Sequence, residues 1–284
     1  MAAGSRRAVV LAGVLVAGLL RPPGQQARIA GCFERGSPSA RWSLPALYRE
    51  VSGLTLSEDG RLFLHNDESG VIGAIDPATG RVVGNYRLGP ALPVADFEGI
   101  AAAGNRLYLV TSRGALYETA MPARGSATGT LPFTVIQTGV GRLCEIEGLG
   151  YEPSDQVLLL ACKGPRVKSL KGVVAIFRWS AGKKALAEPD RIQVRVDDLA
   201  KGQKGRAFSA TGIERDPISG HYLMVAGPDR AIAEIDRSGR VLGAWPLRGK
   251  HSQAEGIAVT PAGDVLVSDE GVPGPGTVTV YACR

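Results

Sequence analysis

The chain has 284 residues, of which 44% are hydrophobic and 6% aromatic, and its formal net charge is +6. This length and apolar content suffice for one large core. The scarcity of aromatic residues argues against a stacking groove for carbohydrate or single-stranded nucleic acid, and the mild basicity is no signature of a nucleic-acid partner.

The N-terminus has the pattern of an export signal. Arg6 and Arg7 precede the apolar run 8–20, and Arg21-Pro22-Pro23 follows it. Thirteen apolar residues are too few to span a bilayer comfortably. We therefore expect residues 1–27 to be a signal peptide or export segment. Cleavage near Ala27 removes three arginines, so the net charge falls to +3 (6 − 3).

Two endings of this signal are open. Ile29-Ala-Gly-Cys32 resembles the cleavage sequence that leaves a lipid-modified cysteine, although residues 22–28 separate it from the apolar core that it should adjoin. The protein is thus expected to be exported and periplasmic or envelope-associated. A lipoprotein anchored through Cys32 is the alternative, and any membrane association is expected through the N-terminus only. Residues 28–39 are expected to be a flexible segment.

One β-type run recurs five times in the rest of the chain. The copies are Glu50-Val-Ser-Gly-Leu54, Asp96-Phe-Glu-Gly-Ile100, Glu145-Ile-Glu-Gly-Leu149, Ser209-Ala-Thr-Gly-Ile213 and Gln253-Ala-Glu-Gly-Ile257. Each copy is followed by a turn and a second apolar run. Such a unit cannot bury its own apolar faces, so the copies must stack, and all-β repeats of this length stack as propeller blades.

The spacing of the copies predicts the blade count. The shared glycines are separated by 46, 49, 64 and 44 residues, which places an insertion in the third copy, around 163–171 and 183–203. After the last copy only three strands remain, and a strand within Ala40 to Ala46 is expected to complete that blade. We predict an all-β, five-bladed β-propeller as a single domain over residues 40–284. A six-bladed propeller and a flat β-sandwich are the alternatives.

The four cysteines fall into two candidate pairs. Cys144 and Cys162 lie symmetrically about Pro153 in a predicted turn, so they are cross-strand neighbours that can bridge in an oxidising compartment or remain buried thiols. Cys32 and Cys283 lie near opposite ends of the chain. In a closed ring they can also pair, unless Cys32 carries lipid.

Carboxylates recur beside the shared glycines. The residues just before them are Ser52, Glu98, Glu147, Thr211 and Glu255, and those two positions earlier are Glu50, Asp96, Glu145, Ser209 and Gln253. The first strand of each blade lies nearest the propeller axis, so these side chains are expected to form rings around the channel. Unpaired carboxylates there repel one another, and oxygen ligands suit Ca²⁺.

The predicted calcium ligands are Glu98, Glu147, Glu255, Glu50, Asp67 and Asp269. Asp67 and Asp269 follow second strands, where they either complete the coordination shell or cap turns. The alternative for the three Glu-Gly carboxylates is a set of inter-blade contacts, through hydrogen bonds or through Arg49, Arg142 and Arg206. We predict metal binding, with these contacts as the competing interpretation.

Standard catalytic motifs are absent from the sequence. It contains no Gly-x-Ser-x-Gly, no His-Glu-x-x-His, no Walker-type phosphate loop and no zinc-type cysteine spacing. The three histidines lie in three different copies. The residues alone therefore indicate no specific reaction.

The repeated phrases resemble one known family. Val51-Ser-Gly-Leu54 with His65-Asn-Asp-Glu68, together with the later Glu-Gly phrases, is similar to the SdiA-regulated domain family of bacterial envelope proteins, and the resemblance runs from about Trp42 to Tyr281. It implies a five-bladed propeller distantly similar to NHL-repeat proteins, with a calcium site at Glu98, Glu147 and Glu255. Ser52 and Thr211 depart from a uniform acidic ring.

Two functions follow from these observations. The first is an exported, calcium-binding propeller that acts as a binding or scaffold module of the bacterial envelope, as a monomer, for a protein or small-molecule ligand. The alternative is a calcium-dependent hydrolase acting on an ester, lactone or phosphoester, with Glu50 or Glu145 as the base.

Overall fold

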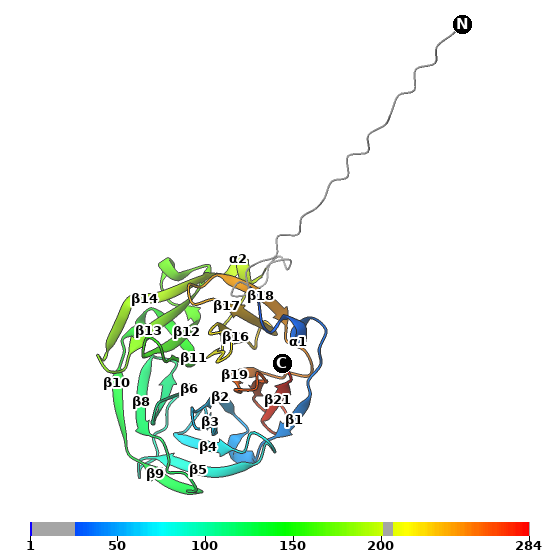
Figure 1. The fold of residues 1–284 in the computed structure, drawn as a ribbon. Coiled ribbons are helices and arrows are strands. Elements are labelled where there is room, and N and C mark those ends of the chain that lie inside the picture. The colour runs from blue at the N-terminus through cyan, green and yellow to red at the C-terminus, as the bar shows by residue number, and fades with distance from the viewer. Residues whose placement is uncertain (2–25, 201–206, 284) are drawn as a thin grey trace.

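The computed structural model describes residues 26–200 and 207–283 together with Met1. The predicted segment 1–27 therefore lies almost wholly outside the described residues. The strands form five sheets arranged in a ring, so that each sheet is one blade of a five-bladed β-propeller (Figure 1). The fold and the number of blades predicted from the repeats are confirmed.

The blades share one topology, in which consecutive strands run antiparallel from the axis outward. Blade 1 contains β2 (Val51–Leu56), β3 (Leu62–Asn66), β4 (Val71–Ile75) and β5 (Val82–Leu88). Blade 2 contains β6 (Phe97–Ala103), β7 (Arg106–Thr111), β8 (Ala115–Ala120) and β10 (Phe133–Gln137). Blade 3 contains β11 (Cys144–Glu152), β12 (Val157–Pro165), β13 (Val173–Ser180) and β14 (Ala185–Arg195). The sequence insertion in the third copy thus lengthens the strands of this blade.

The last two blades complete the ring. Blade 4 contains β15 (Gly212–Arg215), β16 (Tyr222–Ala226), β17 (Ala231–Ile235) and β18 (Val241–Pro246). Blade 5 contains β19 (Ala254–Val259), β20 (Val265–Asp269), β21 (Thr277–Tyr281) and β1 (Ala40–Ser43). The helices are short, α1 (Ala30–Glu34) and α2 (Val196–Leu199), with single 3-10 turns at Ala46–Tyr48, Val140–Arg142 and Lys168–Leu170.

The ring closes through the N-terminal strand. β1 pairs antiparallel with β21, with Ala40 opposite Val280 and Ser43 opposite Thr277. This pairing supplies the outer strand that the last copy lacks, as the sequence predicted. It also joins the two ends of the chain in one sheet, so the toroid has no open seam there.

The outer edge of blade 1 carries a strand that the sequence did not predict. β9 (Thr128–Leu131) leaves blade 2 after β8 and pairs in parallel with β5, with Asn85 opposite Thr128. The excursion covers the hydrogen-bonding groups of an edge strand. Its sequence, Thr-Gly-Thr-Leu, is too short and too mixed to indicate a strand by periodicity.

The segment 28–39, which we expected to be flexible, is packed against the ring. Ile29 and Phe33 are fully buried among residues of blades 4 and 5. The backbone nitrogens of Arg28 and Ile29 each donate to the Glu234 carboxylate at 2.9 Å, and the Arg28 guanidinium bonds Asp216. Apolar burial and paired charges therefore fix this segment.

Both candidate cysteine pairs are disulfides. Cys32 bonds Cys283 with a Cα–Cα distance of 5.3 Å, and Cys144 bonds Cys162 with a Cα–Cα distance of 5.7 Å. A sulfur in a disulfide cannot also carry a lipid thioether, so the structure contradicts lipidation of Cys32. The disulfides are consistent with an exported protein. Within the described residues, no helix has the length and apolar content needed to cross a membrane.

Candidate functional site

The five shared glycines close the middle of the channel. A Cβ on Gly99 would lie 2.7 Å from the backbone nitrogen of Leu149, and a Cβ on Gly256 would lie 2.6 Å from that of Leu54. The inner strands β2, β6, β11, β15 and β19 therefore approach too closely for any side chain at these positions. The space left on the axis is about 10 Å³, roughly enough for one water molecule. The axis thus has two separate mouths, one on each face of the ring.

At the first mouth, β-bulges direct the repeated carboxylates toward the axis. The pairing of β6 with β7 skips Glu98, since Phe97 lies opposite Thr111 and Gly99 lies opposite Val110. The pairing of β11 with β12 skips Glu147 in the same way, and that of β19 with β20 skips Glu255. A bulged residue is unpaired and its side chain is re-aimed. The local Glu-Gly phrase is therefore a bulge signal as well as a close-packing signal.

These three carboxylates lie around a lysine, Lys163, at the start of the 163–171 stretch where the sequence places an insertion. Lys163 is the residue that a second bulge, in β12, leaves between Cys162 and Gly164. Its Nζ lies 3.0 Å from Glu147 Oε2, with side-chain exposures of 30% and 4% respectively. Glu255 is 4% exposed. We call Glu98, Glu147, Glu255 and Lys163 the acidic mouth.

The acidic mouth holds more negative charge than its lysine balances. Burial first, and then the charges of Glu147, Asp96 and Glu255, raise the pKa of Glu98 to about 10. Burial and Glu147 raise the pKa of Glu255 to about 8. Without an added cation, the cluster therefore retains protons near neutral pH.

A second set of carboxylates lies at the rim of the same mouth. Burial and the neighbouring Glu50 raise the pKa of Asp67 to about 6. Burial, Asp67 and Glu50 raise the pKa of Glu270 to about 7, and Glu147 contributes as well. Glu50 and Asp67, both predicted, are thus brought together beside the acidic mouth. Glu270 was not among the predicted ligands.

Asp269 faces away from this mouth. It is fully buried, and its Oδ2 lies 2.8 Å from His251 Nδ1. The other ring nitrogen of His251 lies 2.5 Å from the Tyr281 hydroxyl. Consecutive side chains of a strand point to opposite faces, so Asp269 enters the blade while Glu270 meets Glu50 and Asp67. The structure does not bring Asp269 together with the other candidate ligands.

The acidic mouth suits Ca²⁺ in its chemistry but not in its observed arrangement. All its acceptors are carboxylate oxygens, and Glu255 Oε2 is buried without a hydrogen-bond partner. However, Lys163 holds Glu147, and no group of three Asp, Glu, His or Cys side chains in the described ranges is placed to hold a metal ion. A cation fits here only if the Lys163 ammonium withdraws.

The competing interpretation was that arginines neutralise the carboxylates through contacts between blades. The cation observed beside them is a lysine instead. Arg49 Nε donates to the carbonyl oxygen of Gly271 at 3.1 Å, and Arg206 lies outside the described residues. The cation beside Glu147 is Lys163, from the same blade. The charge of Glu147 is therefore neutralised by Lys163, which was not among the residues expected to pair with it.

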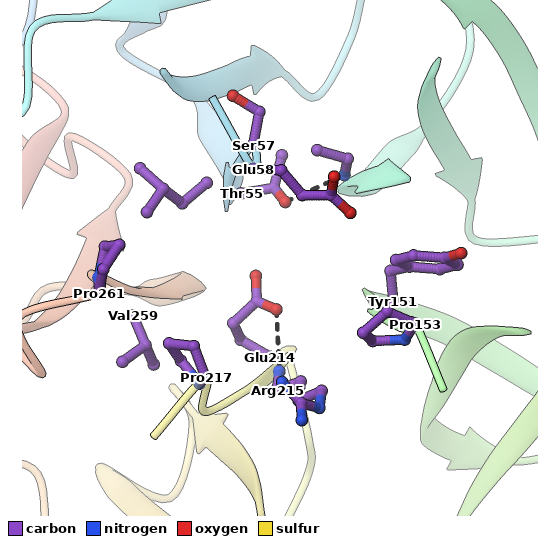
Figure 2. A pocket seen from close by; sticks show the side chains of 12 residues that line it. Thr55, Ser57, Glu58, Tyr151, Pro153, Glu214, Arg215, Pro217, Val259 and Pro261 are labelled. Atoms are coloured by element: carbon purple, nitrogen blue, oxygen red, sulfur yellow. Dashed lines mark hydrogen bonds between the residues drawn. The ribbon is translucent and has the colours of Figure 1, made fainter. Parts of the chain in front are cut away.

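The second mouth contains a pocket of about 170 Å³ to which all five blades contribute (Figure 2). Its lining residues are Thr55, Leu56, Ser57, Glu58, Ala102, Tyr151, Pro153, Glu214, Arg215, Pro217, Val259 and Pro261. They follow the shared glycines, at the opposite ends of the inner strands from the acidic mouth. No motif in the sequence marks these residues as a site.

The fold and its two axial mouths define a five-bladed β-propeller with an acidic centre on one face. The profile of the SdiA-regulated family matches residues 39–273. The chain therefore belongs to the SdiA-regulated family, as its repeated phrases indicated. No curated protein sequence matches it.

Solved structures share the propeller architecture at low sequence identity. The glutaminyl cyclase of Myxococcus xanthus is similar with a TM-score of 0.59 and 19% identity, covering 86% of this chain and 94% of that one. A luciferin-regenerating enzyme is similar with a TM-score of 0.55 and 9% identity, over 85% of this chain and 94% of that one. The PQQ-bound form of the aldose sugar dehydrogenase of Streptomyces coelicolor is similar with a TM-score of 0.52 and 13% identity, over 86% of this chain and 99% of that one. Identities this low show a common fold only.

Proposed function

We propose that this protein is an exported binding module of the bacterial envelope whose acidic mouth takes up Ca²⁺ in exchange for the Lys163 ammonium and the retained protons. The observation that carries the proposal is Glu255 Oε2, a buried carboxylate oxygen without a hydrogen-bond partner, in a cluster of three carboxyl groups and one ammonium. Buried acceptors without partners are costly, and a hard cation satisfies them.

The three carboxylates come from blades 2, 3 and 5. Glu98 is on β6, Glu147 on β11 and Glu255 on β19. A calcium ion in this position would be coordinated by carboxylate oxygens from three blades and would link those blades at the axis. The rim pair Glu50 and Asp67 adds negative charge beside it, which raises the local concentration of cations.

Lys163 acts as the built-in competitor for this site. Burial by itself lowers the pKa of Lys163, but the carboxylates, with Glu147 foremost, raise it above its ordinary value, so the lysine is charged and occupies the place of a metal. Its side chain is 30% exposed, and its four-carbon stem is long enough to swing the ammonium to solvent. The calcium affinity therefore depends on how much more strongly the carboxylates bind Ca²⁺ than they bind the Lys163 ammonium.

Export is the second part of the proposal. Its support is the pair of disulfides, since such bonds persist in oxidising compartments. The apolar run 8–20 behind two arginines supplies the matching targeting signal.

Thermal unfolding with Ca²⁺ or with chelator tests the calcium site. A ligand at 100 times its Kd stabilises the native state by about 2.7 kcal/mol, which raises the Tm of a protein of this size by roughly 5–10 °C. We expect this shift in the wild type and in Glu188→Gln, an exposed carboxylate far from the axis. We expect it to be lost in Glu255→Gln. In Lys163→Met the shift should appear at a calcium concentration at least tenfold lower.

Two outcomes would change the proposal. If calcium shifts neither the wild type nor Lys163→Met, the acidic mouth is an ion-paired contact between blades and not a metal site. If the protein hydrolyses aryl esters, lactones or phosphoesters and the chelator stops this turnover, the hydrolase replaces the binding module as its function.

A further inference from the structure

The second mouth differs from the first in having a single carboxyl group, that of Glu214, at the centre of a pocket with several apolar wall residues. Two residues after the shared glycines the chain has Thr55, Ala101, Gly150, Glu214 and Ala258. Of these five residues, Thr55 and Glu214 line the pocket, whereas Ala101 and Ala258 are buried in the hydrophobic core. Glu214 is the one acidic side chain at this repeat position.

Glu214 extends from β15 into the middle of the pocket (Figure 2). One of its oxygens, Oε1, accepts a hydrogen bond from the backbone nitrogen of Arg215 at 2.8 Å. The Arg215 guanidinium is directed to a different acid, with its Nε 3.5 Å from Glu152 Oε2. Burial raises the pKa of Glu214 to about 8. Near neutral pH this carboxyl group therefore keeps a proton, and a cation placed beside it favours the ionised form.

The walls around Glu214 are apolar. Leu56, Val259 and the prolines Pro153, Pro217 and Pro261 line the pocket, and the ring of Tyr151 forms part of one side. Glu58, which is exposed, adds a second carboxylate at the opening. Apolar walls with one convergent charged group are typical of sites for small organic ligands.

We infer that this pocket binds a small organic ammonium ion, with its charged nitrogen on the free oxygen of Glu214 and its apolar body against the prolines and Val259. Arg215 also lines the pocket, but its guanidinium lies against Glu152, so Glu214 and Glu58 disfavour an anionic ligand. A single carboxylate among apolar groups is a poor metal site. Tyr151 offers a ring face, to which an ammonium group is attracted.

The volume limits the size of this ligand. A cavity of about 150 Å³ holds a benzene-sized molecule, so about 170 Å³ accepts a single ring or a short branched chain with its amino group. The closed ring of glycines separates this pocket from the acidic mouth, so the inference does not depend on calcium binding.

Matched ligands on the full chain test the inference. Cyclohexylmethylamine, which is an ammonium ion at neutral pH, and its neutral isostere cyclohexylmethanol are titrated and followed by ligand-observed NMR and calorimetry. We expect the amine to bind at least tenfold more tightly than the alcohol to the wild type and to Glu188→Gln. In Glu214→Gln, which keeps the shape, this preference should disappear.

A second variant keeps the test decisive if Glu214→Gln folds poorly. Ala102→Leu fills the pocket from blade 2 and leaves Glu214 in place, so it should abolish amine binding while the protein still unfolds in one cooperative transition. The inference would be overturned if the wild type binds the amine and the alcohol equally or does not bind the amine at all. It would also be overturned if Glu214→Gln keeps the preference or if Ala102→Leu still binds the amine.

Discussion

The ring of glycines makes the sharpest stability prediction. In Gly99→Ala, the new Cβ would lie 2.7 Å from Leu149 N and 2.9 Å from Glu147 O, both backbone atoms. Ordinary contacts begin at 3.4 Å, so β6 and β11 must separate by about 0.7 Å (3.4 − 2.7). Overpacking of this kind costs about 1–3 kcal/mol. The same movement carries Glu98 away from Glu147.

A matched glycine removes the effect of the unfolded state. A Cβ added at Gly182 would meet no atom within 4 Å, and Gly182 has no positive φ, so Gly182→Ala changes only the entropy of the unfolded chain. The two variants are compared by denaturant unfolding. We expect Gly99→Ala to be less stable than Gly182→Ala by about 1–3 kcal/mol. A difference below about 0.5 kcal/mol, within the usual scatter of surface substitutions, would refute the close approach of the inner strands.

Three further predictions follow from the disulfides, the acidic mouth and the N-terminal segment. Cys32→Ser opens a loop with a sequence separation of 251 and Cys144→Ser one of 18, so chain entropy predicts losses of about 5 and 3 kcal/mol; equal losses in denaturant unfolding would contradict this order. In chelator, native Glu255 keeps a proton that the unfolded chain releases, because its pKa is raised from 4.5 to about 8. The free energy of unfolding should therefore fall as the pH rises from about 5 to 8, less steeply in Glu255→Gln, and parallel profiles would disprove the assignment. Arg28→Ala leaves the fully buried Asp216 without its guanidinium and should cost about 3 kcal/mol, whereas a loss below about 1 kcal/mol would show that Arg28 does not anchor the segment.

The architecture was predictable because its determinants are local. Each of the three Glu-Gly phrases encodes a bulge and a close approach within a few residues, and five copies of the β-type run at intervals of 44 to 64 residues favour stacking as five blades. The closing strand β1 (Ala40–Ser43) followed from counting strands. The repeated pattern therefore predicts this part of the fold, because each blade is built from a similar short sequence.

The acidic mouth was only partly predictable. Glu98, Glu147 and Glu255 were expected on the axis because of their shared position, but Lys163 is aimed there by a bulge in β12, in a blade whose spacing is irregular. The assignment of Asp269, the last residue of β20, and of Glu270, which follows it, depends on the face to which the end of this strand directs each side chain. An error of one residue in register reverses that assignment.

The packed segment 28–39 and the pocket around Glu214 depend on contacts between distant parts of the chain. Glu234 receives Arg28 and Ile29 across more than 200 positions, and no periodicity indicates such a pairing. Glu214 was visible in the sequence as the one acid among small residues at its repeat position, a signal that becomes informative once the inner strands are aligned.

The central claim is that Ca²⁺ and Lys163 compete for the carboxylates of the acidic mouth. Crystals grown with saturating calcium test it directly through the anomalous signal of the metal. The account predicts a calcium peak bonded to Glu98, Glu147 and Glu255, with Lys163 Nζ displaced from Glu147 toward solvent. A structure at saturating calcium in which Lys163 still contacts Glu147 and no peak lies on the axis would contradict it.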